Sequence, residues 1–281
     1  MYYHVNGDLV PAAEATISVA DRGFKYGDAA FETLRAYGGT PLAWDAHHER
    51  LQRTAETLGF ADAVPEDLRD RVDRTLAEND LAEAYVRVSV TRGVQPGKLT
   101  PDPDVDPGVV VLVKELPRGG QEGTRVWDEP ATVQTVRTRK AASDAIPADA
   151  KTHNYLNGLL GRIELRRSAG GGTPADECLL RDNADHVVEG ATSNLFFVSD
   201  DGLRTPSADL DLLPGITRDI VLELASEEDF PVETGRYGVD AVRNADEAFL
   251  TNSTWEIRPI ATIDGIEVGG GPMTTLLQRL F

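Results

Sequence analysis

A short glycine-rich, polar stretch at 118–123 divides this chain of 281 residues into two parts, and each part mixes strand and helix patterns. In the first part, two extended runs flank a Gly38-Gly39-Thr40 turn, and two helix patterns follow. In the second part, helix patterns again alternate with short strand runs, and no segment repeats. The glycine-rich, polar composition of 118–123 is typical of a linker. The pattern predicts an α+β protein of two mixed α/β domains, at 1–117 and 124–281.

Apolar spacing and end signals place the expected elements. Asp45 is expected to cap a helix that Gly59 ends. Gly170-Gly171-Gly172 follows a helix and lacks the Lys and Ser or Thr of a phosphate-binding loop, so we interpret it as a helix terminator. The expected helices are 45–59, 65–79, 154–169, one from 217 and one at 273–280, and the expected strands of the first domain are 31–37, 41–44, 84–90 and 108–113.

The balance of charge is strongly acidic, with 47 Asp and Glu against 28 Lys and Arg and a formal net charge of −19. Nucleic acid is excluded as a partner, because a field of this sign repels phosphate backbones. The acidic residues are spread along the chain and form no terminal tail. This solvated acidic coat resembles that of proteins from salt-loving organisms, and an acidic protein of an ordinary organism remains the alternative.

Several classes of protein are not expected from the remaining composition. No run approaches the ~18 apolar residues of a membrane span, and the first residues do not resemble a signal peptide. The lone Cys178 has no disulfide partner within the chain, which is typical of a reducing compartment. We therefore expect a cytoplasmic protein. His47 and His48 are adjacent and lack the i, i+4 spacing of a helical metal pair, so no metal is expected.

Three segments could carry chemistry. The run 213–219 places a glycine turn before an amphipathic helix, whose unpaired N–H groups could hold a phosphate, although most helix starts bind nothing. Lys151 stands at the start of a helix pattern, where burial could make it a nucleophile able to form a Schiff base, or it is an ordinary surface lysine. Glu189 leads into an apolar strand and needs a cationic partner there, unless it is a solvated turn residue.

Taken together, these segments resemble the class IV aminotransferases, the fold-type IV enzymes that depend on pyridoxal phosphate. The family includes branched-chain aminotransferases, D-amino acid aminotransferases and aminodeoxychorismate lyases. The resemblance covers nearly the whole chain, through seven ordered motifs. These are Tyr26-Gly27-Asp28 with Phe31-Glu32-Thr33, Arg50-Leu51, Tyr85-Val86-Arg87, Lys151 with Asn154-Tyr155-Leu156, Glu189-Gly190 with Ser193-Asn194, Leu213-Pro214-Gly215-Ile216-Thr217-Arg218, and Thr251-Asn252-Ser253-Thr254.

The resemblance implies a role for each matched residue, in a cleft between the two domains. Lys151 is similar to the lysine that holds pyridoxal 5'-phosphate as an internal aldimine and carries the substrate's α-proton. Glu189 is similar to the partner of the ring nitrogen, which it keeps protonated. The implied cofactor-binding residues are Arg50, Ile216, Thr217, Ser253 and Thr254 at the phosphate and Tyr155 at the phenolic oxygen, and the implied substrate-binding residues are Tyr26, Tyr85 and Arg87.

The substrate is less closely defined by the motifs. We expect transamination between a small amino acid, branched-chain or similar, and a 2-oxo acid. Three motifs resemble those of aminodeoxychorismate lyases, which release 4-aminobenzoate and pyruvate, so this activity is the alternative: Phe31-Glu32-Thr33, Thr91-Arg92-Gly93 and Thr251-Asn252-Ser253. The loop after Tyr85 has Lys98 and no His, unlike the D-amino acid enzymes. The family also implies a homodimer, in which the loop 95–101 reaches the neighbour's site.

Overall fold

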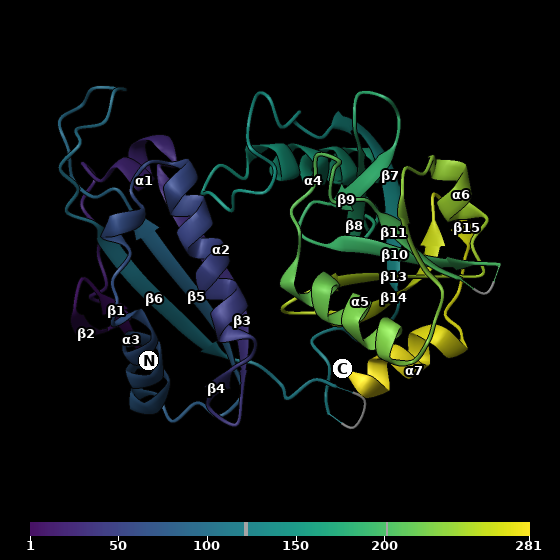
Figure 1. Cartoon of the computed structure of the whole chain (residues 1–281), viewed down its shortest axis with the longest axis horizontal. Helices are drawn as coiled ribbons and strands as arrows, with labels where there is room; N and C mark the ends of the chain where they lie inside the picture. Colours follow the sequence, from purple (N-terminus) through teal and green to yellow (C-terminus); the bar gives the residue numbers. More distant parts are fainter. Residues whose placement is uncertain (121–122, 201) are drawn as a thin grey trace. The chain divides into compact units, whose positions relative to one another are not determined.

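The structure is a computed structural model that describes residues 1–120, 123–200 and 202–281, and the chain divides into two compact units (Figure 1). The first unit comprises Met1–Arg118 with Ala150–Asn154, and the second comprises Gly119–Asp149 with Tyr155–Phe281. Residues 121 and 122 of the expected linker lie outside the described residues. The segment Ala150–Asn154 belongs to the first unit although the sequence analysis assigned it to the second domain, because its backbone bonds to a strand of the first unit.

The first unit is a six-stranded antiparallel sheet with two helices packed on one face. Alternate residues of the central strands, such as Val86 and Val88, are buried against apolar residues of the two helices, such as Leu51 and Val72. This period-2 burial leaves the intervening residues of each strand on the opposite face. The strands, in the order β2-β1-β6-β5-β3-β4, are β1 (Tyr2–Val5), β2 (Asp8–Pro11), β3 (Ala29–Tyr37), β4 (Thr40–Pro41), β5 (Ala84–Thr91) and β6 (Gly108–Glu115). The helical segments are α1 (Arg22–Tyr26), α2 (Trp44–Thr57), the 3-10 helix η1 (Ala61–Ala63) and α3 (Leu68–Glu78).

The second unit is a nine-stranded mixed sheet with helices around it (Figure 1). Its strands are β7 (Ala131–Arg139), β8 (Glu177–Arg181), β9 (Val187–Gly190), β10 (Asn194–Ser199), β11 (Gly202–Pro206), β12 (Val232–Gly235), β13 (Glu247–Asn252), β14 (Glu256–Ile263) and β15 (Ile266–Glu267). They run in the order β12-β11-β10-β13-β14-β7-β8-β9, and β15 pairs with β14. The helices are α4 (Leu156–Ser168), α5 (Ile216–Glu227), α6 (Val239–Arg243) and α7 (Pro272–Leu280). The two mixed units confirm the α+β class.

The ends of two helices test the sequence analysis directly. The structure contradicts the assignment of Asp45 as a cap: α2 begins at Trp44 after Ala43, whose φ is 48°, and no side chain caps it. Asp45 lies instead inside the first turn, where its carboxylate still favours the positive end of the helix. The glycine terminator is confirmed, since α4 ends at Ser168 and Gly170 adopts a φ of +56°. Within the described ranges, no helix has the length and apolar character to cross a membrane.

Candidate active site

Lys151 is held by its backbone along the free side of β3. The Lys151 carbonyl accepts the N–H of Phe31 at 3.0 Å, and the N–H of His153 bonds to the carbonyl of Ala29 at 3.1 Å. On the other side, the Lys151 N–H donates to the Thr54 hydroxyl of α2 at 3.0 Å. The segment 150–154 therefore acts as a short added strand, and its fixed backbone determines where the Lys151 side chain begins.

The Lys151 ammonium lies beside an aromatic ring that other cationic groups share. Its Nζ is 4.7 Å from the centre of the Phe31 ring, and the Arg87 guanidinium carbon is 3.8 Å from the same centre. The His153 ring meets Phe31 edge-on with centres 5.5 Å apart. Arg87 lies on β5, opposite Thr33 of β3. Lys151 and one of the three expected substrate residues are thus brought together over Phe31.

His153 should make the protein sensitive to acid. Burial and the Arg87 guanidinium lower its pKa from 6.5 to about 4, so the unfolded chain takes up this proton before the folded chain does. Stability should fall as the pH drops from about 6.5 to about 4, by roughly 3 kcal/mol for this group. In His153→Gln, which can still bond to the Ser89 hydroxyl, urea titrations should show a smaller loss over this range. An equal loss in both proteins would contradict the assignment.

Arg50 lies in a buried ion pair that the motif comparison did not reveal. Its Nε and Nη2 each donate to a carboxylate oxygen of Glu32 at 2.7 Å, and His47 Nδ1 lies 2.8 Å from Glu32 Oε2. All three side chains are buried between β3 and α2. A two-point Arg–carboxylate bond of this kind fixes the plane of the guanidinium. Glu32 therefore orients the side chain that the resemblance places at the phosphate.

The ionisation of Glu32 follows from these contacts. Burial would raise the pKa of this carboxyl, but the hydrogen bonds and charge of Arg50, with His47, lower it from 4.5 to about 2. Burial also lowers the pKa of His47. Because the folded-state pKa of Glu32 is depressed, the pair contributes stability above pH 4.5, and this contribution is lost as the pH falls towards 2.

The two tyrosines expected at the substrate lie at different places in the first unit. Tyr26 ends α1, and the Arg22 guanidinium lies 4.9 Å from its ring centre. Tyr85 lies on β5, on the same side of the strand as Arg87, with the Lys114 ammonium 5.5 Å from its ring centre. Both rings therefore have cationic neighbours.

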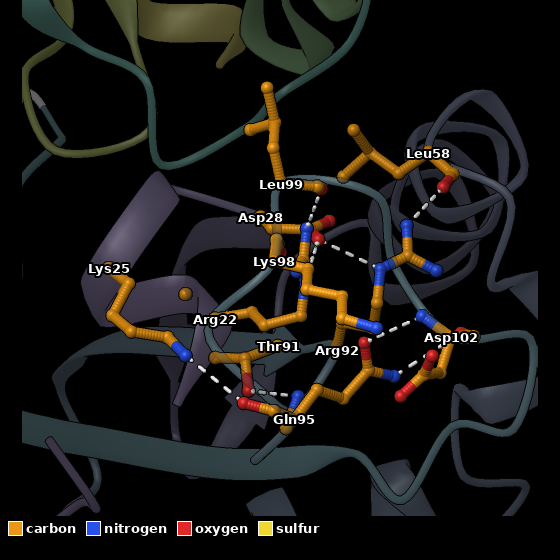
Figure 2. Close-up of polar contacts among 12 residues, drawn as sticks. Arg22, Lys25, Asp28, Leu58, Thr91, Arg92, Gln95, Lys98, Leu99 and Asp102 are labelled. Carbon is orange, nitrogen blue, oxygen red and sulfur yellow. Dashed lines mark hydrogen bonds and ion pairs between the residues drawn. The ribbon is translucent and has the colours of Figure 1, made fainter. Parts of the chain in front are cut away.

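A network of arginines fixes the loop that follows β5 (Figure 2). Asp28 Oδ2 accepts from Arg22 Nε at 2.7 Å and from Arg92 Nε at 2.8 Å. The other two Arg22 nitrogens donate to the carbonyls of Lys98 and Leu99 at 2.7 and 2.8 Å. Burial would raise the pKa of Asp28, but the bonds from Arg92 and Arg22 bring it below its ordinary value. The loop expected to reach a second subunit is thus tied to the Tyr26-Gly27-Asp28 motif.

In the second unit, Glu189 joins three segments at the end of β9. One oxygen accepts the N–H of Leu213 at 3.0 Å, and the other forms an ion pair with the Lys140 ammonium. The carboxylate is buried. Glu189 is therefore not a solvated turn residue, and the cationic partner that a buried carboxylate needs is Lys140, which no motif had indicated.

The turn 213–215 leads into α5, and it is held from both sides. The Leu213 N–H donates to Glu189, and the Leu213 carbonyl accepts from Asn194 Nδ2 at 2.9 Å. A Cβ on Gly215 would lie 2.1 Å from the Asn194 side-chain oxygen, so this position requires glycine. No side chain caps α5 at Gly215, and Ile216 and Thr217 of its first turn are buried. The motif containing Asn194 therefore shapes a helix start whose N–H groups suit an anion.

The last two cofactor positions lie elsewhere in the second unit. Ser253 and Thr254 form the turn between β13 and β14, and Asn252 Oδ1 shapes it by accepting the N–H groups of Thr254 and Trp255 at 2.9 and 2.7 Å. Tyr155 precedes α4 as its N-cap residue and is partly exposed.

The expected site residues divide between the two units, and the structure brings together two groups of them. Arg50, Lys151 and Arg87 gather around β3 in the first unit, whereas Glu189, Ile216 and Thr217 gather around the start of α5 in the second.

Sequence reasoning missed the supporting roles of Glu32, His47 and Lys140. One signal was available for Glu32: it is a carboxylate in a strand of otherwise apolar alternate residues, Ala30, Leu34 and Ala36, and it needs a cation there.

Comparison with known proteins identifies the family. The family model described as "Amino-transferase class IV" matches residues 29–263. The chain belongs to the class IV aminotransferases. This confirms the resemblance drawn from the seven motifs. It also establishes the protein as an enzyme that depends on pyridoxal phosphate.

Several relatives of this aminotransferase match along nearly their full length. It is 33% identical to a putative branched-chain-amino-acid aminotransferase of Methanocaldococcus jannaschii, over 100% of this chain and 94% of the relative. It is 32% identical to a D-alanine aminotransferase of Listeria monocytogenes, over 99% and 93%. It is 31% identical to an aminodeoxychorismate lyase of Bacillus subtilis, over 99% and 92%. The family thus holds relatives with three different named activities.

A solved structure gives the same fold. A branched-chain aminotransferase of T.th. with pyridoxamine 5'-phosphate matches with a TM-score of 0.88 and 29% identity, over 99% of this chain and 92% of that chain.

Two features of the second unit fit such a cofactor. The buried, uncapped start of α5 suits a phosphate, and the buried carboxylate of Glu189 suits a protonated ring nitrogen.

Proposed function

We propose that this class IV aminotransferase moves an amino group between a small amino acid, branched-chain or similar, and a 2-oxo acid. The observation that carries this proposal is the arrangement over Phe31. The Arg87 guanidinium and the Lys151 amine lie over the same ring, so a substrate whose carboxylate pairs with Arg87 would have its α-carbon near Lys151. The Methanocaldococcus relative supports the branched-chain class.

We assign the roles as follows. When bound, pyridoxal phosphate supplies an electron-accepting ring that stabilises the charge left by the departing α-proton. Lys151 would hold the cofactor covalently until the substrate's amino group displaces it, and its freed Nζ would then move the proton from the substrate's α-carbon to the cofactor's C4′. Glu189 would accept a hydrogen bond from the ring nitrogen, and Tyr155 would donate one to the phenolic oxygen. The phosphate would be held by Arg50, Ile216, Thr217, Ser253 and Thr254, and the substrate would contact Tyr26, Tyr85 and Arg87.

The alternative activity is the lyase reaction that releases 4-aminobenzoate and pyruvate, which the Bacillus relative supports. Thr91-Arg92-Gly93 is one of the three motifs that suggested it. In this fold, however, Thr91 donates to Asp21 and Arg92 donates to Asp28, so both side chains are engaged within the first unit. This motif is therefore explained by folding, and transamination stays the main proposal.

A screen with purified holoenzyme separates the two activities. Leucine, isoleucine, valine and alanine, each as both enantiomers, are offered with 2-oxoglutarate, and aminodeoxychorismate is offered in a parallel assay. We expect 2-oxo acids from the branched-chain donors and no 4-aminobenzoate above the blank. Release of 4-aminobenzoate without any transamination would overturn the proposal in favour of the lyase.

We also propose a homodimer, and α4 supports it. Leu156, Leu159 and Leu160 on this helix are 64%, 54% and 46% exposed, whereas its glycines point inward. A Cβ on Gly158 would lie 3.0 Å from the Ala191 carbonyl oxygen, and one on Gly161 would lie 2.8 Å from Cys178 Sγ. The helix therefore turns its glycines and Leu165 inward and these three leucines outward, as expected of a face that a second copy covers.

The dimer should depend on these leucines and on salt. Leu159→Asp should give a monomer in light scattering with little activity, because a charge would be buried in the interface. Ile266→Asp, which changes a similarly exposed residue of the same unit, should remain a dimer.

The wild-type dimer should dissociate as salt is lowered. The Debye length grows from ~3 Å at 1 M to ~10 Å at 0.1 M, so the repulsion between two chains of charge −19 is less screened at low salt.

Either half of this prediction can fail separately. A dimeric Leu159→Asp variant would remove α4 from the interface. A wild-type dimer that is indifferent to salt from roughly 0.05 to 2 M would remove the electrostatic argument.

We further propose that the enzyme works in the cytoplasm of a salt-rich cell. The net charge of −19 supports the high salt. The single cysteine, which is buried and has no partner for a disulfide in the chain, supports a reducing compartment.

A further inference from the structure

Lys140 is held next to Glu189 by contacts of both its side chain and its backbone. Its ammonium pairs with Glu189 Oε1, while Leu213 engages Oε2. The Lys140 side chain is 18% exposed and that of Glu189 is 9% exposed, so water screens the pair weakly. An ion pair this enclosed differs from the flexible pairs of a protein surface.

The backbone on both sides of Lys140 is fixed. The Lys140 N–H donates to the carbonyl of Arg181 on β8 at 2.9 Å. The Asn157 side chain of α4 bridges the two neighbouring residues: its Nδ2 donates to the carbonyl of Arg139 at 2.8 Å, and its Oδ1 accepts the N–H of Ala141 at 3.0 Å. A clamp from β8 and α4 therefore holds the residue that carries the ammonium.

Other charged groups on the elements packed against β9 are engaged elsewhere. Arg181 and Arg139 both pair with Asp185, and Asp182 pairs with His186. Arg162 of α4 pairs with Glu177 of β8, and Asp211, in the loop before α5, accepts from Ser143. Among the described residues, the ion pairs of Glu189 thus involve Lys140 alone.

From this geometry we propose that Lys140 is a positioning residue that keeps Glu189 ionised and oriented for the cofactor's ring nitrogen. The inference rests on the proposed role of Glu189. A buried carboxylate without a cation tends to take up a proton, and a protonated Glu189 could not keep the ring nitrogen charged. Lys140 balances the charge before the cofactor enters. Once the cofactor is bound, the carboxylate's charge is shared between the ammonium and the ring.

The test follows the Glu189 carboxyl itself. In the cofactor-free protein, its side-chain carboxyl carbon can be titrated by 13C NMR, and the resonance is assigned by its absence in Glu189→Gln. In Lys140→Met, we expect Glu189 to bind its proton at least tenfold more tightly than in wild type. Lys140→Arg should restore the wild-type titration, because it keeps the charge. Arg243→Met, which removes a pair with Asp264 in the same unit, is the matched control and should leave the titration unchanged.

A second readout follows cofactor binding. Below the new titration midpoint, Lys140→Met should lose pyridoxal phosphate affinity in fluorescence titrations, while wild type and Lys140→Arg should not. If Lys140→Met does not fold, Lys140→Gln carries the same expectation. A Glu189 titration that is identical in wild type and in the neutral variant would overturn the proposal. The NMR measurement needs no turnover, so its failure is distinct from a failure of the proposed transamination, which the substrate screen tests.

Discussion

Lys151→Ala should abolish turnover, by far more than ~10³-fold, because the covalent attachment and the proton carrier are both lost. The fold should survive the change. The contacts that place the segment use the backbone of Lys151, whose carbonyl accepts from Phe31 and whose N–H donates to Thr54. The measurement is steady-state turnover, accompanied by circular dichroism to show that the variant is folded.

Borohydride reduction gives an independent check of the same assignment. Reduced cofactor should stay attached to acid-precipitated wild type and to the control Lys98→Ala, and it should be absent from Lys151→Ala. Attachment to the Lys151→Ala protein would show that another lysine holds the cofactor.

Arg50→Ala should have the second-largest effect, and it should act on both stability and cofactor retention. The substitution leaves Glu32 buried without its guanidinium partner, which costs about 3–5 kcal/mol of the free energy of unfolding. It also removes a donor proposed for the phosphate. We expect an unfolding midpoint well below that of wild type, and loss of cofactor through dialysis that added pyridoxal phosphate partly reverses.

A double variant separates the two effects of Arg50. In Arg50→Ala with Glu32→Leu, the buried charge is gone, so most of the stability should return. Cofactor retention should remain weak, because the phosphate donor is still missing. If the folded double variant retains cofactor through dialysis as wild type does, Arg50 does not hold the phosphate.

The local parts of this fold could be predicted from the sequence because their causes lie within a few residues. The start of α5 after Gly215 and the end of α4 before Gly170 follow from turn and cap chemistry, which acts over one helical turn. The alternating apolar residues of 84–90 and the valine-rich run at 108–113 likewise indicate β5 and β6. Asp45 shows the limit of this reasoning, because the cap position of α2 lies two residues earlier, at an Ala43 with positive φ. Pattern alone does not determine which residue starts a helix.

The seven ordered motifs determined the family, the cofactor and the candidate residues, because each motif keeps its residue types at a fixed local spacing. Only the tertiary structure decided which residues support them. Glu32 and Arg50 are 18 residues apart and Lys140 and Glu189 are 49 apart. Similarly, 97 residues separate Lys151 from the Thr54 that holds its backbone. Strand pairing and helix packing create these contacts between distant segments. A charged residue within an apolar strand pattern indicates that it needs a partner of opposite charge, but only the tertiary structure determines which residue that partner is.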